Sequence, residues 1–387
     1  MDELSVQDPP PLPSQDRRVP FPQGRACPYH PPAGYAPLRD SAPLGKVTLY
    51  DGRSAWAVTG HAVARELLAD PRLSRARTRP GFPEHDARPL PAPHVTSGRV
   101  ASLRPRVERI VDRLLDTVVE QGPPAELVSA FALPTAASVI GVLLGVPDGD
   151  HGFFEACARR LLTARTADEV ARARGELGRY IGELTDRERR EPGDGLLDEL
   201  THPDAPAGPL GRDELVALSG ALLAAGHGIT AGMISLGVFT LLDHPGRPAA
   251  LRAGGTPMHA VVEELLRYVS VADGVARVAA EDIEVAGHTI RSGEDVVFVT
   301  PLINRDGSVF ARPDVLDWER AAGRHLAFGL GAHQCPAQDL ARLGLETALR
   351  GLFERLPGLR LAVPAAEVRS GPVTAGVAGL LELPVAW

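Results

Sequence analysis

The sequence predicts a single large domain that is mainly α-helical and contains small β-sheets. Over most of the chain after residue 100, apolar residues recur at a spacing of three to four, which is typical of amphipathic helices. Hydrophobic residues make up 44% of the 387 residues and charged residues 23%, so the chain can bury a large core. No internal repeat or polar linker divides residues 45–387, and we expect the Pro-rich leader over residues 1–44 to pack on this domain.

The first elements are short. Residues 47–50 and 55–58 are expected to form a β-hairpin whose turn is Asp51-Gly52. A helix over residues 61–69 should end before Pro71, because proline cannot continue it. Six prolines between residues 71 and 98 indicate a loop.

The remaining chain is predicted to be helical until strands appear near the end. Helices are expected over 100–120, 125–145 with a bend at Pro134, 151–164, 167–189, 211–242, 257–269 and 337–355. Residues 281–285, 288–291 and 296–299 predict a three-stranded meander with glycines at its turns.

Composition and charge exclude several classes of protein. The 41 basic and 49 acidic residues give a net charge of −8, which argues against a nucleic-acid-binding protein. Three widely spaced cysteines do not make a disulfide framework and favour a reducing cytoplasm, and the acidic, Pro-rich start does not resemble a signal peptide. Residues 215–242 contain no Asp, Glu, Lys or Arg, but Gly226, His227 and Gly228 at their centre favour a buried core helix over a membrane span.

One string carries most of the chemical information. Residues 325–335 read His-Leu-Ala-Phe-Gly-Leu-Gly-Ala-His-Gln-Cys and run into the helix expected from residue 337. Glycines let the backbone curl around the Cys335 sulfur, and the N-terminus of a helix stabilises a thiolate. Such a thiolate is a metal ligand or a nucleophile, whereas we interpret Cys27 and Cys157 as small apolar residues.

This string resembles the heme-thiolate loop of the cytochromes P450, in which a Phe-Gly-x-Gly-x-His-x-Cys pattern precedes a helix. Two further matches support the resemblance: Glu264 and Arg267 fit the family's Glu-x-x-Arg, and residues 304–320 resemble the segment that supplies Arg320. The resemblance spans roughly Phe21 to the C-terminus. It implies a P450-like fold and is strongest for soluble actinobacterial enzymes that receive electrons from a ferredoxin.

The resemblance also implies roles for individual residues. Cys335 would ligate the iron of heme b as a thiolate, which is how this cofactor activates dioxygen. Glu264, Arg267 and Arg320 would form a buried charge network that braces the heme loop. Arg277 and His333 would bind the heme propionates, and Phe328 would pack beside the sulfur. Arginines near the loop, such as Arg324 and Arg342, would face the ferredoxin.

The sequence departs from the family pattern in the long central helix. The family pattern Ala-Gly-x-acid-Thr-Thr aligns with Ala225–Thr230, so Gly228 stands in place of the acid and Ile229 in place of the alcohol. In the family this pair relays the protons that oxygen activation needs. Only Thr230 keeps a hydroxyl nearby, and His227 is expected to point away from the heme.

A second departure lies in the helix that follows Pro83-Glu84-His85 in the family pattern. The arginine expected four residues after His85 is Pro89, and further prolines would break a helix begun there. His85 either reaches a propionate or is a solvated loop histidine. A smaller departure is Ala337, which replaces the usual glycine after the Cys motif.

These features predict a heme-thiolate monooxygenase. It would use O2 and electrons from a ferredoxin and its reductase to oxidise a small apolar substrate in the cytoplasm, without a membrane or nucleic-acid partner. The alternative is a catalytically impaired P450-like helper of another biosynthetic enzyme, which the departures favour. The intact motif around Cys335 favours the enzyme, because a helper has no physical need for a thiolate ligand.

Overall fold

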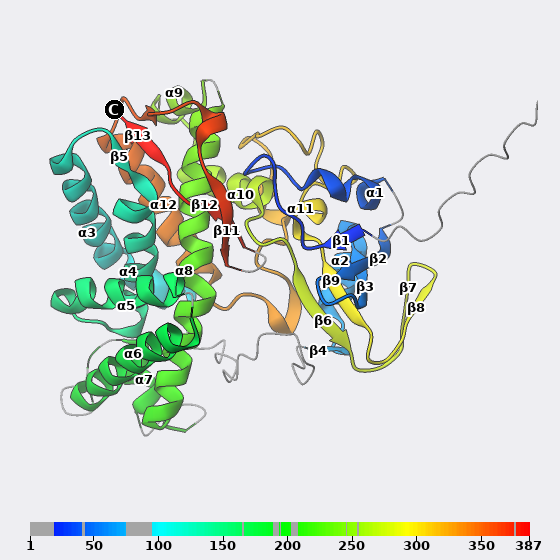
Figure 1. Cartoon of the computed structure of the whole chain (residues 1–387), viewed down its shortest axis with the longest axis horizontal. Coiled ribbons are helices and arrows are strands. Elements are labelled where there is room, and N and C mark those ends of the chain that lie inside the picture. The colour runs from blue at the N-terminus through cyan, green and yellow to red at the C-terminus, as the bar shows by residue number, and fades with distance from the viewer. Residues whose placement is uncertain are drawn as a thin grey trace, which may run out of the picture.

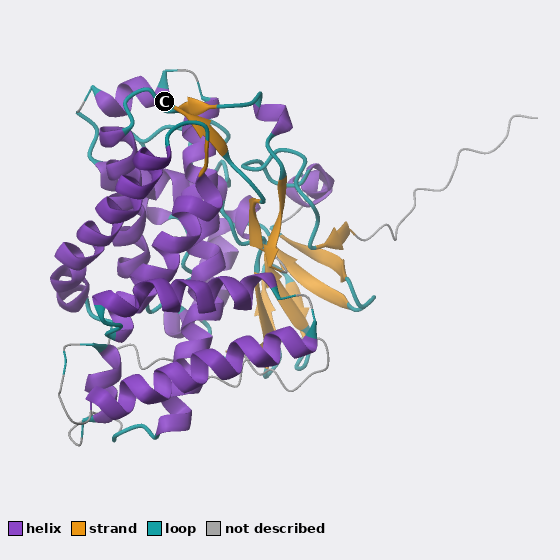
Figure 2. Ribbon diagram, turned by 60° about the vertical axis from the view of Figure 1, so that its left-hand side comes forward, coloured by secondary structure: helices purple, strands orange, loops and turns teal. Residues whose placement is uncertain are grey.

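The structure is a computed structural model. It describes residues 19–40, 43–74, 95–164, 166–188, 193, 195–202, 208–244, 246–253, 255–374 and 377–387. Helices gather on one side of the molecule and most strands on the other (Figures 1 and 2). This is the mainly α-helical fold with small sheets that the sequence predicts.

The helical side is built around α8, which runs through its centre (Figure 1). Helix α8 (Arg212–Asp243) contacts α4, α6 and α12. The other long helices are α3 (Ser97–Gln121), α4 (Leu133–Leu144), α5 (His151–Thr163), α6 (Ala167–Glu188), α10 (Met258–Val269) and α12 (Gln338–Arg355). All the long helices expected from the apolar spacing are present, and their ends shift by a few residues except for the one expected from residue 125, which begins later.

Short helices fill the connections between these elements. They are α1 (Ala36–Arg39), α2 (His61–Ala69), α7 (Leu196–Thr201), α9 (Arg247–Arg252) and α11 (Thr300–Ile303). Of these, only α2 was predicted, because the others are too short to show a helical repeat in the sequence.

The largest sheet has six strands in the order β1-β2-β3-β9-β6-β4. They are β1 (Val19–Phe21), β2 (Leu44–Leu49), β3 (Ser54–Val58), β4 (Leu73–Ser74), β6 (Val275–Ala279) and β9 (Asp295–Phe298). Strands β2 and β3 form the predicted hairpin, and Gly52 supplies the positive φ of its turn (+81°). Strand β9 lies parallel to β3 and antiparallel to β6, so it joins distant parts of the chain.

The predicted three-stranded meander is wrong. Strands β7 (Ile283–Val285) and β8 (His288–Ile290) pair with each other, and β9 belongs to the six-stranded sheet instead. All four residues of β9 are buried, which is typical of an interior strand covered on both faces. The sequence-based prediction also missed β6, the second neighbour of β9.

The predicted start of a helix at residue 125 is wrong as well. Residues Ala125–Glu126 form strand β5, and a π-helical turn over Val128–Ala132 precedes α4. Pro134 in the first turn of α4 has no N–H to donate to the preceding turn, and the chain widens there.

In the described part of the chain, three small sheets complete the fold. Strand β5 joins β13 (Pro384–Ala386) and β10 (Arg360–Leu361), while β11 (Ser370–Thr374) and β12 (Val377–Leu380) form a hairpin against α8. Figure 1 shows this hairpin beside the upper half of α8.

Residues 19–40 of the expected leader lie against the rest of the chain. Strand β1 pairs with β2, and the side chain of Tyr35 is completely buried. The Arg25 guanidinium forms an ion pair of 3.0 Å with Asp273 and donates to the carbonyl of Val269. Residues 1–18 lie outside the described part of the chain.

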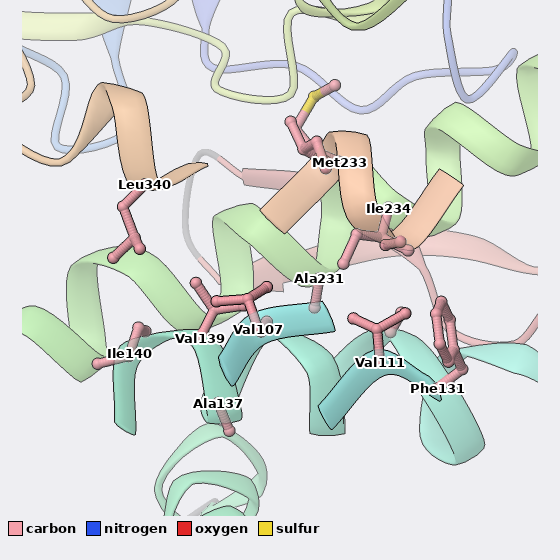
Figure 3. Close-up of a cluster of buried hydrophobic side chains, with 14 of the residues drawn as sticks. Val107, Val111, Phe131, Ala137, Val139, Ile140, Ala231, Met233, Ile234 and Leu340 are labelled. Carbon is pink, nitrogen blue, oxygen red and sulfur yellow. The ribbon is translucent and has the colours of Figure 1, made fainter. Parts of the chain in front are cut away.

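The main core lies where α3, α4 and α8 meet. Figure 3 shows Val107 and Val111 of α3, Val139 of α4 and Ile234 of α8 packed together. Among the described residues, α8 is the one helix long and apolar enough to cross a membrane, but 67% of its most apolar stretch of 18 residues is buried inside the fold. Helix α8 is therefore the buried core helix that its central glycines and histidine predict.

Candidate active site

Residues 325–337, here named the Cys loop, connect a short 3₁₀ turn to the start of α12. The loop is closed by a hydrogen bond of 2.8 Å from the Cys335 N–H to the Phe328 carbonyl. Within it, the Gln334 N–H donates to the Gly331 carbonyl at 3.0 Å. These bonds hold Cys335 beside Phe328 and just before the first turn of α12.

Two glycines make this path possible. Gly329 has a φ of +72° and Gly331 a φ of +74°, which other residues rarely adopt. A Cβ at Gly331 would also lie 2.6 Å from the Leu68 carbonyl oxygen at the end of α2. The loop therefore lies in direct contact with α2.

The first residue of α2, His61, also contacts the segment just before the Cys loop. The His61 Nε2 lies 2.8 Å from the Arg324 carbonyl oxygen, and the His61 N–H donates to Asp306. The His61 side chain is buried, at 1% exposed. The two ends of α2 thus contact Arg324, just before the Cys loop, and Gly331 within it.

The sulfur environments of the three cysteines differ. Cys335 is half-buried at the N-terminal end of α12, where the helix dipole and N–H groups stabilise a thiolate. Burial raises the pKa of the Cys157 thiol in α5, which keeps it protonated and inert. Cys27 is half-buried and packs against the main core. The structure thus distinguishes Cys335 by the same feature as the sequence.

Glu264 contacts both Arg267 and Arg320. The Arg267 guanidinium donates to both oxygens of Glu264 at 2.7 Å, and both side chains are completely buried. Arg320 Nε lies 3.4 Å from Oε1 of Glu264, and the backbone N–H of Asp317 donates to the same oxygen. In the structure these three side chains thus form the charge network that the resemblance implies.

Asn304 connects this network to the Cys loop. Its carbonyl accepts a hydrogen bond of 3.0 Å from Arg267 Nη1, and its side-chain oxygen accepts one of 2.7 Å from the Leu326 N–H. Leu326 is the second residue of the Cys loop. The buried arginine therefore supports the loop through one asparagine, a link that the sequence did not reveal.

Other predicted site residues are found at several places around the fold. Arg277 lies on β6, is 7% exposed and donates to the Ala276 carbonyl at 2.8 Å. His333 is half-buried in the 3₁₀ turn of the Cys loop, and the half-buried ring of Phe328 packs against the main core. His85 and the prolines around it lie outside the described residues.

Arg342 is not the exposed surface arginine that the sequence suggested. Its Nε lies 2.6 Å from Oε1 of Glu263, and its guanidinium stacks over the Phe328 ring at 4.6 Å from the centroid. Arg324, in contrast, is exposed. Sequence reasoning missed Glu263 because its neighbour Glu264 accounts for the recognisable motif.

Helix α8 runs without a break through Ala225–Thr230. The ring of the buried His227 points to α4, where its Nε2 lies 3.1 Å from the Leu133 carbonyl oxygen. Burial lowers the His227 pKa to about 4, so the ring is neutral near pH 7. Ile229 lies about 200° round the helix from His227, and its side chain is 37% exposed.

Exposed apolar side chains in the middle of a central helix indicate an apolar surface able to bind a ligand. Ala225 and Ile229 are one helical turn apart and both exposed. Cys335 supplies a half-buried thiol and Arg277 a buried guanidinium. A soft sulfur ligand, apolar surface and a cation suit a flat apolar macrocycle with a metal and carboxylates, so these residues fit heme.

Comparison with known proteins identifies the family. Residues 257–356 match the cytochrome P450 family model. The chain is 59% identical to cytochrome P450-SOY of Streptomyces griseus, over 95% of this chain and 94% of that protein. The chain belongs to the cytochrome P450 family. It is also 55% identical to the pentalenic acid synthase of Streptomyces avermitilis, over 95% of this chain and 97% of that protein.

Solved P450 structures confirm the fold. The structure of CYP105D6 superposes with a TM-score of 0.88 at 46% identity, covering 96% of this chain and 99% of that one. P450 MoxA of Nonomuraea recticatena gives a TM-score of 0.87 at 40% identity, covering 95% and 98%. This chain is therefore a cytochrome P450 monooxygenase, and its cofactor is heme with a cysteine thiolate ligand. The comparisons give no support to an impaired helper protein.

Proposed function

We propose that this P450 inserts one oxygen atom of O2 into a small apolar substrate, with electrons from a ferredoxin and its reductase in the cytoplasm. The observation that carries the proposal is the Cys loop, closed by the bond between Cys335 N–H and the Phe328 carbonyl. Relatives named pentalenic acid synthase and vitamin D3 dihydroxylase support a role in oxidising small molecules.

Each site residue has a proposed task. Cys335 ligates the heme iron as a thiolate, favoured by the N-terminus of α12, and heme bound there supplies the oxygen-activating chemistry. Arg277 and His333 bind the heme propionates by charge and hydrogen bonding, and His85 joins them on the strength of the sequence alone. Phe328 packs beside the sulfur and limits water there. Glu264, Arg267 and Arg320 hold the loop in place.

Helix α8 supplies the substrate side of the proposal. The exposed side chains of Ala225 and Ile229 offer an apolar wall, which suits an apolar substrate. The half-buried Thr230 keeps the one hydroxyl of this stretch and is the proposed proton donor. His227 takes no part, because its ring is neutral and directed at the α4 carbonyl.

The partner surface is proposed to lie at the Cys loop. Arg324 precedes the loop and Arg65 lies on α2, which contacts the loop, and both side chains are exposed. Exposed cations at this place would attract an acidic ferredoxin and align it for electron transfer.

An isotope experiment tests the proposed function. The purified protein is supplied with ferredoxin, ferredoxin reductase, NADPH and ¹⁸O₂, together with a panel of small apolar compounds and a panel of charged ones. A product that gains one ¹⁸O atom from an apolar compound, and only when ferredoxin is present, is the expected result. Product formation that ignores ferredoxin, or that is confined to charged compounds, would contradict the proposal.

A further inference from the structure

A second charge cluster, which is half-buried, lies between α10 and the Cys loop. It consists of Glu263, His325 and Arg342 and is named here the Glu263 cluster. Arg342 contacts both oxygens of Glu263, with Nε 2.6 Å from Oε1 and Nη2 3.3 Å from Oε2. His325 Nε2 lies 3.3 Å from Oε2, and the His325 side chain is 1% exposed. One carboxylate therefore faces two cationic or donating side chains.

The Glu263 carboxyl is ionised under ordinary conditions. Burial raises its pKa, but the His325 and Arg342 side chains more than offset this effect and hold the pKa at about 2. Glu263 is 18% exposed, so water screens these contacts only partly.

His325 links Glu263 to the backbone of the Cys loop. Its Nδ1 accepts a hydrogen bond of 3.2 Å from the Ala327 N–H. A ring nitrogen that accepts carries no proton, and the other ring nitrogen, Nε2, is the one that faces Glu263. The Ala327 N–H and the Glu263 carboxylate therefore face opposite edges of the His325 ring, and the contact at Nε2 is electrostatic, without hydrogen-bond geometry.

Arg342 links Glu263 to the side chain of Phe328. The guanidinium lies 4.6 Å from the Phe328 ring centroid, a cation–π contact, while two contacts with Glu263 fix its plane. The carbonyl of Phe328 accepts the Cys335 N–H. One route from Glu263 therefore ends at Phe328, in the turn that holds Cys335, and the other ends at Ala327, the residue before it.

The neighbouring carboxylates of α10, Glu263 and Glu264, have different partners. Glu264 pairs with Arg267 and Arg320, whose direct bonds go to backbone carbonyls outside the Cys loop, and Arg267 reaches the loop only through Asn304. Glu263 lies about 100° round the helix from Glu264, and its partners contact the loop itself. Removing Glu263 would therefore loosen Ala327 and Phe328 and leave the Glu264 network in place.

We propose that Glu263 is a positioning residue for the Cys loop, acting through His325 and Arg342 to fix the Ala327 backbone and the Phe328 ring against Cys335. This inference rests on the proposed role of Cys335 as the heme ligand. A ring held in place keeps water from the sulfur, and an ordered turn keeps the sulfur in its thiolate form.

The test compares Glu263→Gln with Glu346→Gln. Glu346 is a matched control because its side chain is 16% exposed and lies 3.8 Å from Arg104, away from the Cys loop. The first readout is the share of the reduced, carbon monoxide-bound protein that has a thiolate-type absorption spectrum. The second is amide hydrogen exchange at Ala327 and Cys335, measured without turnover.

We expect Glu263→Gln to lose a several-fold larger share of the thiolate-type spectrum than Glu346→Gln, and to exchange both amides several-fold faster. His325→Asn, whose side-chain oxygen can accept the Ala327 N–H, should retain more of the spectrum than His325→Leu. If Glu263→Gln does not hold heme, Arg342→Lys gives the same comparison, since it keeps a charge for Glu263 but loses the flat contact with Phe328.

Three outcomes would overturn the inference. Glu263→Gln could keep the parent spectrum and exchange rates, Glu346→Gln could change them equally, or His325→Asn and His325→Leu could behave alike. A parent protein without a thiolate-type spectrum would instead refute the proposed ligand, and this inference would fall with it. The failure of the function and the failure of the inference are therefore distinguishable.

Discussion

At the scale of single residues, the buried Arg267 guanidinium is the most demanding group near the site. It is completely buried and donates to Glu264 and to the carbonyls of Asn304 and Pro313. An arginine does not lose its proton in a protein, so a buried guanidinium stays charged and needs a carboxylate partner to offset the cost of burying that charge. Glu264 is thus a structural requirement of the fold next to the Cys loop.

Glu264→Ala should lower the free energy of unfolding by about 3–5 kcal/mol, because it leaves a buried cation without its partner. Denaturant unfolding of the heme-bound protein measures the change. The control is Glu354→Ala, which removes an exposed carboxylate of α12 and should change stability little. Equal effects of the two substitutions would show that the network does not brace the fold.

At the scale of elements, the contact between α2 and the Cys loop depends on a close backbone approach. Gly329 and Gly331 share nearly the same positive φ, but they differ in their surroundings. A Cβ at Gly329 would find its nearest neighbour at 3.9 Å, whereas one at Gly331 would meet the Leu68 carbonyl at 2.6 Å. The two positions therefore separate backbone strain from a steric clash.

Gly331→Ala should destabilise the heme-bound protein clearly more than Gly329→Ala. Both substitutions impose a left-handed conformation on alanine at about 1–2 kcal/mol, and only the first also forces α2 and the loop apart. Thermal unfolding and the rate of heme loss to a heme acceptor measure the difference. Indistinguishable variants would mean that α2 does not constrain the loop.

Helix α8 raises the question of proton supply. Gly228 and Ile229 carry no group that can transfer a proton, and Thr230 lies about 100° round the helix from Ile229. We expect Thr230 to donate protons inefficiently from this direction, so the parent should release hydrogen peroxide unless a substrate hydroxyl or amine assists. The double change Gly228→Glu with Ile229→Thr should raise product formed per electron pair several-fold.

The yields of product and hydrogen peroxide per NADPH consumed test this expectation, with Gly228→Ala plus Ile229→Val as the matched control. The control keeps α8 helical and adds no acid or alcohol, so it should behave like the parent. Full coupling in the parent with a substrate that lacks hydroxyl and amine groups, together with no effect of the double change, would contradict it.

At the scale of the whole molecule, sequence patterns predicted elements formed within one segment and missed contacts between segments that are distant in the sequence. The long helices were predictable because the apolar spacing of each lies within its own segment. The pairing of β9 with β3 was not, because it joins residues 55–58 to residues 295–298, and no local pattern encodes that contact. Likewise Cys335 and Glu264 lie in recognisable strings, whereas the contacts of Arg342 with Glu263 and of His61 with Arg324 arise only on folding.

Buried histidines predict how overall stability depends on pH. Burial lowers the pKa of His151 and of His227 from 6.5 to about 4. The unfolded chain then binds more protons than the folded one between these values, so stability should fall as pH drops from about 6.5 to 4. His227→Gln, which can still donate to the Leu133 carbonyl, should remove part of this loss.

Thermal unfolding across this pH range measures the effect. The exposed His288 provides the control, and His288→Gln should leave the pH dependence unchanged. A His227→Gln protein that loses stability as steeply as the parent would show that His227 is not protonated on unfolding in this range.

The central claim is that Cys335 ligates heme iron as a thiolate, and the absorption spectrum of the reduced protein with carbon monoxide tests it most directly. The parent should give a thiolate-type spectrum, and so should Cys27→Ser, which changes a half-buried cysteine outside the Cys loop. Cys335→Ser should lose that spectrum. A Cys335→Ser protein that kept the parent spectrum would contradict the claim.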